Sequence, residues 1–152
     1  MTKVIIPELK FTPWQRWESR SSIENAKFPG VYVLAITEKE LEGAEVEYKD
    51  VCYIGMSNSK KGLLGRWDQF RQAIKGVKGR HSGGDTVFRY LKDFDKWQYR
   101  LYVAACPIAC DIESRKPEDL RLMGIVAYLE YEAFAQFSEK HDELNKPKYN
   151  TK

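Results

Sequence analysis

The sequence predicts an α/β fold of the α+β type, in which helices flank a small three-stranded antiparallel sheet. The chain has 152 residues, of which 43% are hydrophobic, and this is enough for one domain with its own core. Two short runs, 31–36 and 51–55, are rich in β-branched and aromatic residues and have the length of strands. From residue 62 onward, apolar residues recur at the spacing of amphipathic helices. Together these runs predict the element order ββααβα.

The strands are expected in three places. The first strand, 31–36, follows a Pro-Gly turn, and the second, 51–55, is its antiparallel partner. Between them lies an acidic segment, 38–50, which is expected to form an extended hairpin connection. A third strand is expected over 97–105, where apolar and polar side chains alternate.

Three helices complete the pattern. The first is expected to begin at residue 62 and to end at the glycines between 76 and 84. A second, short helix would have Asp85 as its N-cap. The last helix is expected to run from about Pro117 to about Lys140, because a proline and two acidic residues in a first turn suit the start of a helix.

The ends of the chain and its cysteines bear on domain organisation and location. Residues 1–28 lack a clear period and are expected to form an arm that packs on the domain, which spans 29–152. The chain has no run of about 20 apolar residues, as a membrane helix needs, and its N-terminus lacks the apolar part of a signal peptide. Three cysteines form an odd set, so reduced thiols and a cytoplasmic location are expected. Zinc binding by these cysteines would also need a histidine, and neither histidine has a zinc-finger spacing.

The net charge of +3 is unevenly distributed along the chain. The acidic segment 38–50 has a net charge of −4, which leaves +7 on the remainder. Residues 56–92 carry nine basic and only two acidic residues, which favours a surface that contacts phosphates. A solvated charged face is an equally good interpretation of this charge. The candidate contacts to nucleic acid are Lys60, Lys61, Arg71, Lys75, Lys78, Arg80 and Arg89.

Five features in chain order resemble the GIY-YIG nuclease superfamily. Gly30-Val31-Tyr32 and Tyr53-Ile54-Gly55 resemble its two naming motifs, and both lie on expected strands. The other three features are an arginine on the next helix, a glutamate on the last helix and a late asparagine, namely Arg66, Glu130 and Asn150. The resemblance covers nearly the whole chain after Phe28.

This resemblance implies a catalytic mechanism. Glu130 and water molecules would hold one Mg²⁺ or Mn²⁺, and Arg66 would hold a non-bridging phosphate oxygen. Tyr32 would be the general base, with its pKa lowered by nearby positive charge, and Tyr53 would hydrogen-bond beside it. Asn150 would help to hold the substrate, although it could also lie on the surface of a fraying tail. The products would carry 5′-phosphate and 3′-hydroxyl ends.

The helix phase favours Glu130 over Glu132 as the functional carboxylate. These two residues lie about 200° apart around a helix, so they cannot both face one site. Glu130 falls within the apolar stripe of the helix, where a carboxylate is costly unless it is paired or bound to a metal. The alternative role for Glu130 is a structural ion pair with Arg66 or another base.

Strand alternation places Tyr32 on the same face as Leu34 and Ile36. Tyr53 is expected opposite Tyr32 in the hairpin, so that both phenols could point into one pocket. The alternative is a pair of aromatic side chains that only pack together.

Two departures from the family pattern affect the expected chemistry. Restriction-type members often carry a histidine one turn after the helix arginine, and Phe70 occupies that position here. The alternatives for a base are then Lys60, Lys61 and His81. The acidic segment 38–50 is also longer than usual, and it must point away from the cleft or act as a gate.

The sequence therefore predicts a metal-dependent endonuclease. The expected substrate is DNA, with RNA as an alternative, and the expected assembly is a monomer or a homodimer. The alternative function is a catalytically silent module that binds nucleic acid.

Overall fold

Two β-rich runs of the sequence form the centre of an antiparallel sheet in the computed structural model, which describes residues 5–151. Strand β2 (Gly30–Ile36) pairs on one side with β3 (Tyr53–Ser57) and on the other with β4 (Leu101–Pro107). A short strand, β1 (Gln15–Arg16), pairs with the outer side of β4, which gives the order β1-β4-β2-β3. The expected combination of helices with a small antiparallel sheet is confirmed.

The prediction of three strands is wrong, because the segment before residue 28 contributes β1. The Thr12 amide donates a hydrogen bond to the Ala105 carbonyl oxygen, and the Thr12 hydroxyl accepts one from the Ala105 amide. Trp14 and Trp17, which flank β1, are both buried. A strand of two residues is too short to produce an alternating pattern, so β1 could not be predicted from periodicity.

The third expected strand begins later than predicted. Trp97 belongs to a short helix, α3 (Phe94–Trp97), and a 3₁₀ turn (Gln98–Arg100) precedes β4. Trp97 is buried because its ring packs edge-on against Phe94, with ring centroids 4.9 Å apart, whereas Tyr99 is 69% exposed. The alternation before residue 101 therefore has no relation to the sheet, and α3 and β1 are additions to the expected element order.

Three longer helices surround the sheet: α1 (Gly62–Ile74), α2 (Ser82–Leu91) and α4 (Pro117–Lys140). Helices α1 and α4 begin where the sequence predicts. Helix α2 begins earlier than predicted, because its N-cap is His81 and not Asp85. The Asp85 carboxylate instead accepts a hydrogen bond from the Gly79 amide. Gly83 and Gly84, which were expected to end the previous helix, lie inside α2.

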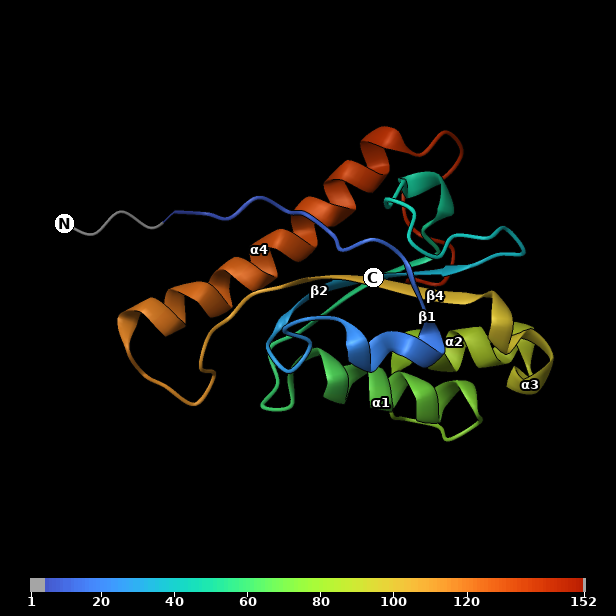
Figure 1. Ribbon diagram of the computed structural model, residues 1–152, viewed down its shortest axis with the longest axis horizontal. Coiled ribbons are helices and arrows are strands. Elements are labelled where there is room, and N and C mark those ends of the chain that lie inside the picture. The colour runs from blue at the N-terminus through green and yellow to red at the C-terminus, as the bar shows by residue number, and fades with distance from the viewer. Residues whose placement is uncertain (1–4, 152) are drawn as a thin grey trace.

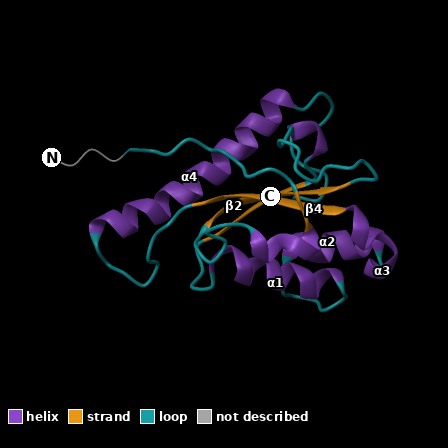
Figure 2. Ribbon diagram, viewed as in Figure 1, coloured by secondary structure: helices purple, strands orange, loops and turns teal. Residues whose placement is uncertain are grey.

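The helices form two layers, one on each face of the sheet (Figures 1 and 2). Helix α4 crosses one face, and α1 and α2 cover the other. Alternate residues of β2 point into the two layers, with Val31 and Val33 toward α4 and Tyr32 and Leu34 toward α1. Among residues 5–151, no helix combines the length and the apolar composition needed to cross a membrane.

The acidic segment 38–50 packs on the α4 side of the sheet. It contains a 3₁₀ turn (Tyr48–Asp50), and Tyr48 donates a hydrogen bond to the Gln136 side chain of α4 at 2.9 Å. Its acidic side chains pair with bases at the β1–β4 edge or within the segment: Glu40 and Glu42 with Arg16, Glu38 with Arg100, and Asp50 with Lys39. The segment thus lies away from the pocket that is described next.

Candidate active site

A pocket of about 230 Å³ lies beside β3, the edge strand of the sheet. Its walls come from five separate parts of the chain: Tyr53 from β3, Arg66 from α1, Ser82 from α2, Glu130 from α4 and Asn150 from the segment after α4. Four of the five residues that the sequence analysis selected therefore share one pocket. The fifth, Tyr32, lies behind Tyr53 and is fully buried.

Tyr32 depends on a glycine for its position. Gly55, and not Tyr53 as expected, lies directly opposite Tyr32 in the β2–β3 register, and Tyr53 is its diagonal neighbour. A Cβ atom at residue 55 would lie 2.6 Å from the Tyr32 hydroxyl oxygen. The absence of a side chain at Gly55 allows the Tyr32 phenol to lie across β3, with its ring centroid 6.1 Å from that of Tyr53.

Tyr53 depends on a second glycine. Its ring packs on Gly83 of α2, where a Cβ atom would lie 2.3 Å from the ring. Glycine inside a helix costs about 1 kcal/mol relative to alanine, so local helix propensity disfavours Gly83 at this position. The close contact with Tyr53 gives a tertiary reason for the glycine. Neither Gly55 nor Gly83 was predicted from the sequence as a determinant of the site.

The pKa values of the two phenols differ from the expectation. Burial raises the pKa of Tyr32 well above its ordinary value, and Tyr53 adds to this effect, whereas the Arg66 guanidinium acts in the opposite direction. Burial also raises the pKa of Tyr53, again against the effect of Arg66. The expectation of a lowered pKa at Tyr32 is wrong, because the loss of hydration outweighs the nearby positive charge. Both phenols keep their protons at neutral pH.

Arg66 and Glu130 reach the pocket from the two helical layers. Arg66 is half-buried, and its Nη1 donates a hydrogen bond to Gln69 Oε1 at 2.8 Å. Glu130 is only 7% exposed, as its position in the apolar stripe predicts. Glu132 lies near Tyr48 and not in the pocket. Burial raises the pKa of Tyr48, and the negative charge of Glu132 adds to this rise. The two glutamates therefore have separate surroundings, and only Glu130 lines the pocket.

Asn150 is a buried residue and not part of a fraying tail. Its Oδ1 accepts a hydrogen bond from the Ile54 amide, and its Nδ2 donates one to the Ile54 carbonyl oxygen, both at 2.9 Å. The Tyr149 amide donates to the Cys52 carbonyl oxygen nearby. The C-terminal segment thus satisfies the outer edge of β3 and holds the strand that carries Tyr53. The bonds of Asn150 are those of a positioning residue.

His81 joins the site from the start of α2. It is 2% exposed, and its Nε2 lies 2.8 Å from the Tyr32 hydroxyl oxygen. Its ring packs edge-on against Phe70, with centroids 5.2 Å apart, so the imidazole lies beside the buried face of α1. The sequence offered only a weak signal, because His81 precedes a Ser-Gly-Gly stretch that is typical of a loop.

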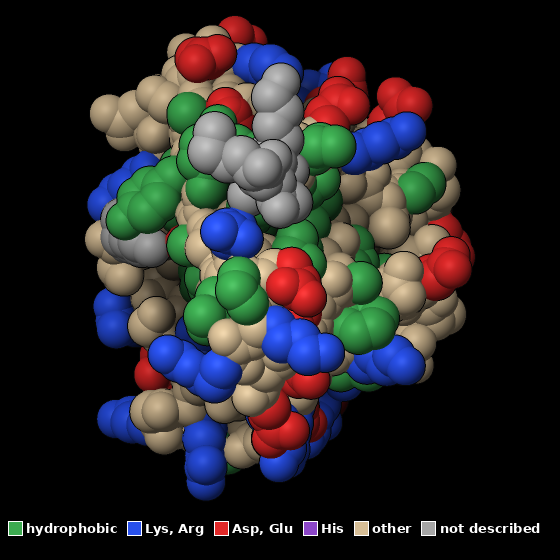
Figure 3. Space-filling model, turned by 90° about the vertical axis from the view of Figure 1, so that its left-hand side faces the viewer, with side chains coloured by type: hydrophobic (Ala, Val, Ile, Leu, Met, Phe, Trp, Pro, Cys, Tyr) green, Lys and Arg blue, Asp and Glu red, His purple; other side chains and the backbone are tan. Residues whose placement is uncertain are grey.

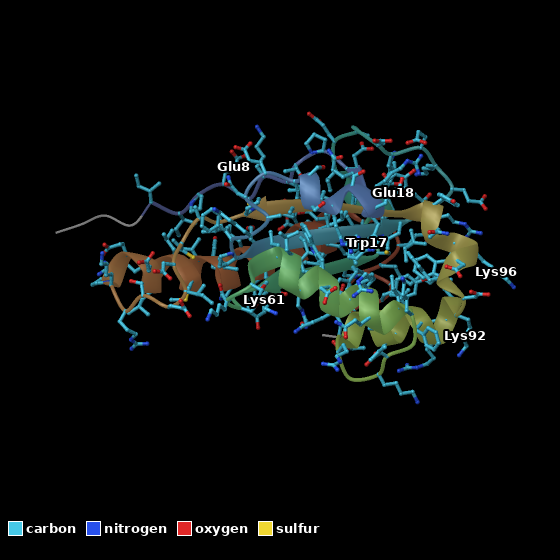
Figure 4. The ribbon with its side chains drawn as sticks, turned by 60° about the horizontal axis from the view of Figure 1, so that its bottom comes forward. Glu8, Trp17, Glu18, Lys61, Lys92 and Lys96 are labelled. Atoms are coloured by element: carbon cyan, nitrogen blue, oxygen red, sulfur yellow. The ribbon has the colours of Figure 1, made fainter. Side chains whose placement is uncertain are left out.

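Several of the predicted contacts to nucleic acid line different cavities. Lys61 and Arg80 line a cavity of about 470 Å³ that adjoins the pocket, because Gln69 of this cavity accepts a hydrogen bond from Arg66 of the pocket. Lys78 and Arg89 line another cavity together with Lys92. Lys61 is at the beginning of α1, and Lys92 lies far from it, at the end of the helical layer near α3 (Figure 4).

The remaining basic residues are partly engaged in ion pairs. Lys60 pairs with Glu113 at 3.1 Å, at a larger cavity of about 600 Å³ that contains none of the predicted catalytic residues. Arg71 pairs with Asp68, and Lys75 is the C-cap of α1. At the end of the molecule where α4 begins, Lys and Arg side chains gather mainly on the α1 side, with acidic side chains between them (Figure 3).

The side chains of the pocket fit a Mg²⁺ ion better than a zinc ion. Within residues 5–151, no group of three or more His, Cys, Asp or Glu side chains is placed to hold a metal ion. Such a set would be needed for a permanently bound zinc ion. Mg²⁺ retains several water molecules and binds through one or two carboxylates together with substrate phosphates. The single buried carboxylate of Glu130 in a pocket of about 230 Å³ fits such a Mg²⁺ site.

Comparisons with known proteins give no further guide to the function. No protein-family model, no curated protein and no solved structure matched the chain. The chemistry of the pocket is therefore the guide to function. A guanidinium, a carboxylate and a protonated phenol meet there at the edge of a sheet.

Proposed function

We propose that this protein is a metal-dependent endonuclease that hydrolyses nucleic-acid phosphodiesters, with DNA as its substrate. One observation carries the proposal: Arg66 and Glu130, from helices on opposite faces of the sheet, line the same pocket as Tyr53. A phosphodiester is negatively charged, so its hydrolysis requires charge neutralisation together with fixed geometry. A cationic fork, a site for a hard cation and an O–H donor in one pocket meet these requirements.

The roles of the side chains follow from their chemistry. The Arg66 guanidinium holds non-bridging phosphate oxygens, since its planar fork matches a phosphate better than an ammonium does. Glu130, together with the substrate phosphate, holds Mg²⁺ or Mn²⁺. When bound, this ion polarises the phosphate and stabilises negative charge on the departing oxygen. Tyr53 donates a hydrogen bond to the phosphate, because burial keeps its phenol protonated.

The substrate approaches along the basic cavity that adjoins the pocket. Lys61 and Arg80 line that cavity, and both are exposed. Lysine and arginine at such a place neutralise backbone phosphates without reading the base sequence. This arrangement supports binding that is strong at low salt and weakly dependent on sequence.

The proposal is tested by cleavage of supercoiled plasmid DNA in the presence of Mg²⁺. Wild-type protein is expected to nick the plasmid, and Glu130→Gln to lose about 100-fold or more of this activity because the cation site is lost. Glu132→Gln is the matched control, since Glu132 lies on the same helix outside the pocket. Equal cutting by wild type and Glu130→Gln would contradict the catalytic role of Glu130.

The second candidate function is a module that binds nucleic acid without cutting it. The raised pKa of Tyr32 favours this alternative, because it removes the residue that was expected to act as the general base. If no DNA or RNA form is cut with Mg²⁺ or Mn²⁺ while a gel shift persists, this second function replaces the first.

A further inference from the structure

His81 takes part in two buried hydrogen bonds, one at each ring nitrogen. Its Nδ1 accepts from the backbone N–H of Gly84 at 3.1 Å, which caps the first turn of α2. Its Nε2 lies 2.8 Å from the hydroxyl oxygen of Tyr32, a residue 49 positions earlier in the chain. His81 and Tyr32 are both buried, so the two bonds form without competition from bulk water.

The first bond determines the direction of the second. A backbone N–H can only donate, so Nδ1 must present its lone pair to Gly84. A neutral imidazole carries one N–H, which then lies on Nε2 and donates to the Tyr32 oxygen. An imidazolium would direct an Nδ1–H at the N–H of Gly84. Burial, together with the charge of Arg66, lowers the pKa of His81 to about 3, which agrees with a neutral ring.

The chain of hydrogen bonds continues toward the pocket. Because the Tyr32 oxygen accepts from His81, its own hydrogen must point to another acceptor. Trp67, whose ring lies 6.0 Å from that of Tyr32, offers only an N–H donor. The phenol of Tyr53, whose ring centroid lies 6.1 Å from that of Tyr32, offers such an acceptor, and hydrogen bonding with Tyr32 lowers the pKa of Tyr53 against the larger effect of burial. Tyr53 is the member of this chain that lines the pocket.

We propose that His81 is a positioning residue, which begins a one-way chain of donated hydrogen bonds through Tyr32 to Tyr53 and thereby aims the Tyr53 O–H at a phosphate oxygen in the pocket. The chain starts at the N-terminus of α2, where backbone N–H groups carry partial positive charge. Each donated bond polarises the next, which strengthens the final donor. His81 cannot take a proton from Tyr32 in this arrangement, since Nε2 already carries one. The proposed catalytic use of this chain rests on the endonuclease function.

The tautomer of His81 can be measured without any activity assay. Two-bond ¹H–¹⁵N correlation spectra of the full chain at neutral pH distinguish the protonated ring nitrogen of a histidine from the other. We expect His81 to carry its proton on Nε2, and His141→Gln assigns the spectrum by removing the only other histidine. A proton on Nδ1 of His81 would overturn the proposal, because Nε2 would then accept from Tyr32.

Two substitutions separate the two bonds of His81. His81→Asn retains an oxygen close to the place of Nδ1, which can cap α2, but its side chain is too short to reach Tyr32. His81→Gln can reach Tyr32 with its amide N–H but gives up the cap. If His81 positions the tyrosines, kcat for plasmid nicking should be about tenfold lower in His81→Asn than in His81→Gln, with little change in KM.

Stability is expected to follow the opposite order in these two variants. His81→Asn should unfold at a higher denaturant concentration than His81→Gln, because asparagine is a favourable N-cap residue. If kcat instead follows stability, the role of His81 is structural and the proposal fails. If the wild-type protein cuts no DNA, the endonuclease function fails separately, and the tautomer still decides whether the hydrogen-bond chain has the proposed direction.

Discussion

The ring of Tyr53 packs on Gly83, where a Cβ atom would lie 2.3 Å from the ring. Gly83→Ala is therefore expected to destabilise the protein by about 1–3 kcal/mol, although alanine favours an isolated helix, because the added methyl group must displace a buried aromatic ring. Urea denaturation followed by circular dichroism measures this change. The matched control is Gly124→Ala in α4, where the new methyl group meets open space. Gly124→Ala should be stabilising by up to about 1 kcal/mol, and equal effects at both glycines would refute the packing argument.

The roles proposed for Glu130 differ in their effect on stability. If Glu130 serves mainly to hold a cation, Glu130→Gln should change the free energy of unfolding by less than about 1 kcal/mol in the absence of metal, since glutamine retains the shape of the side chain. If it is a structural ion pair with Arg66, removal of one partner should cost about 3–5 kcal/mol. Thermal and urea unfolding in EDTA distinguish these outcomes. A large loss that Arg66→Gln restores in the double variant would support the ion pair.

Asn150 should matter for stability as well as for the site. Asn150→Ala leaves the Ile54 amide and carbonyl groups without their side-chain partners at a buried edge. Each unsatisfied group costs about 1–3 kcal/mol, so for the two groups a total loss of roughly 2–6 kcal/mol is expected. Hydrogen exchange at the Ile54 amide should accelerate in parallel. Thr151→Ala, at an exposed neighbour that lines the same pocket, should leave both quantities unchanged.

His81 should make stability depend on pH. Its pKa is about 3 in the folded protein against an ordinary value of 6.5, so the unfolded chain binds more protons between these two values. Stability from this residue is complete above pH 6.5 and is lost as pH falls toward 3, by about 1.4 kcal/mol per pH unit. His81→Gln should remove this part of the slope in urea unfolding at pH 4–7. His141→Gln, at the partly exposed histidine, should retain it.

Binding of nucleic acid should depend on the basic residues beside the pocket. Lys61→Gln and Arg80→Gln are each expected to weaken DNA binding and to reduce the salt dependence of binding by about one phosphate contact. Lys92→Gln and Lys96→Gln, at the far end of the helical layer (Figure 4), should have little effect on either quantity. Fluorescence anisotropy at several salt concentrations measures this. If all four variants lose affinity equally, DNA does not bind specifically along this cavity.

The sequence by itself determined the features that depend on local periodicity. Alternation along β2 separates Tyr32 from Val33, and the 3.6-residue period of α4 buries Glu130 but only half-buries Glu132. The start of α4 also follows from local signals, a proline and acidic residues in its first turn. Each of these properties requires only neighbouring residues, so one sequence suffices to predict it.

Only the tertiary structure decided how these elements meet. The pairing of β1 with β4 joins residues more than 80 positions apart, and local pattern cannot report such a contact. Burial of Tyr32 by the layers around it reversed the expected direction of its pKa shift. Gly83 and His81 resembled a loop in sequence, yet one gives room to Tyr53 and the other holds Tyr32. Their roles depend on contacts between the sheet and α2, and such contacts exist only once the chain has folded.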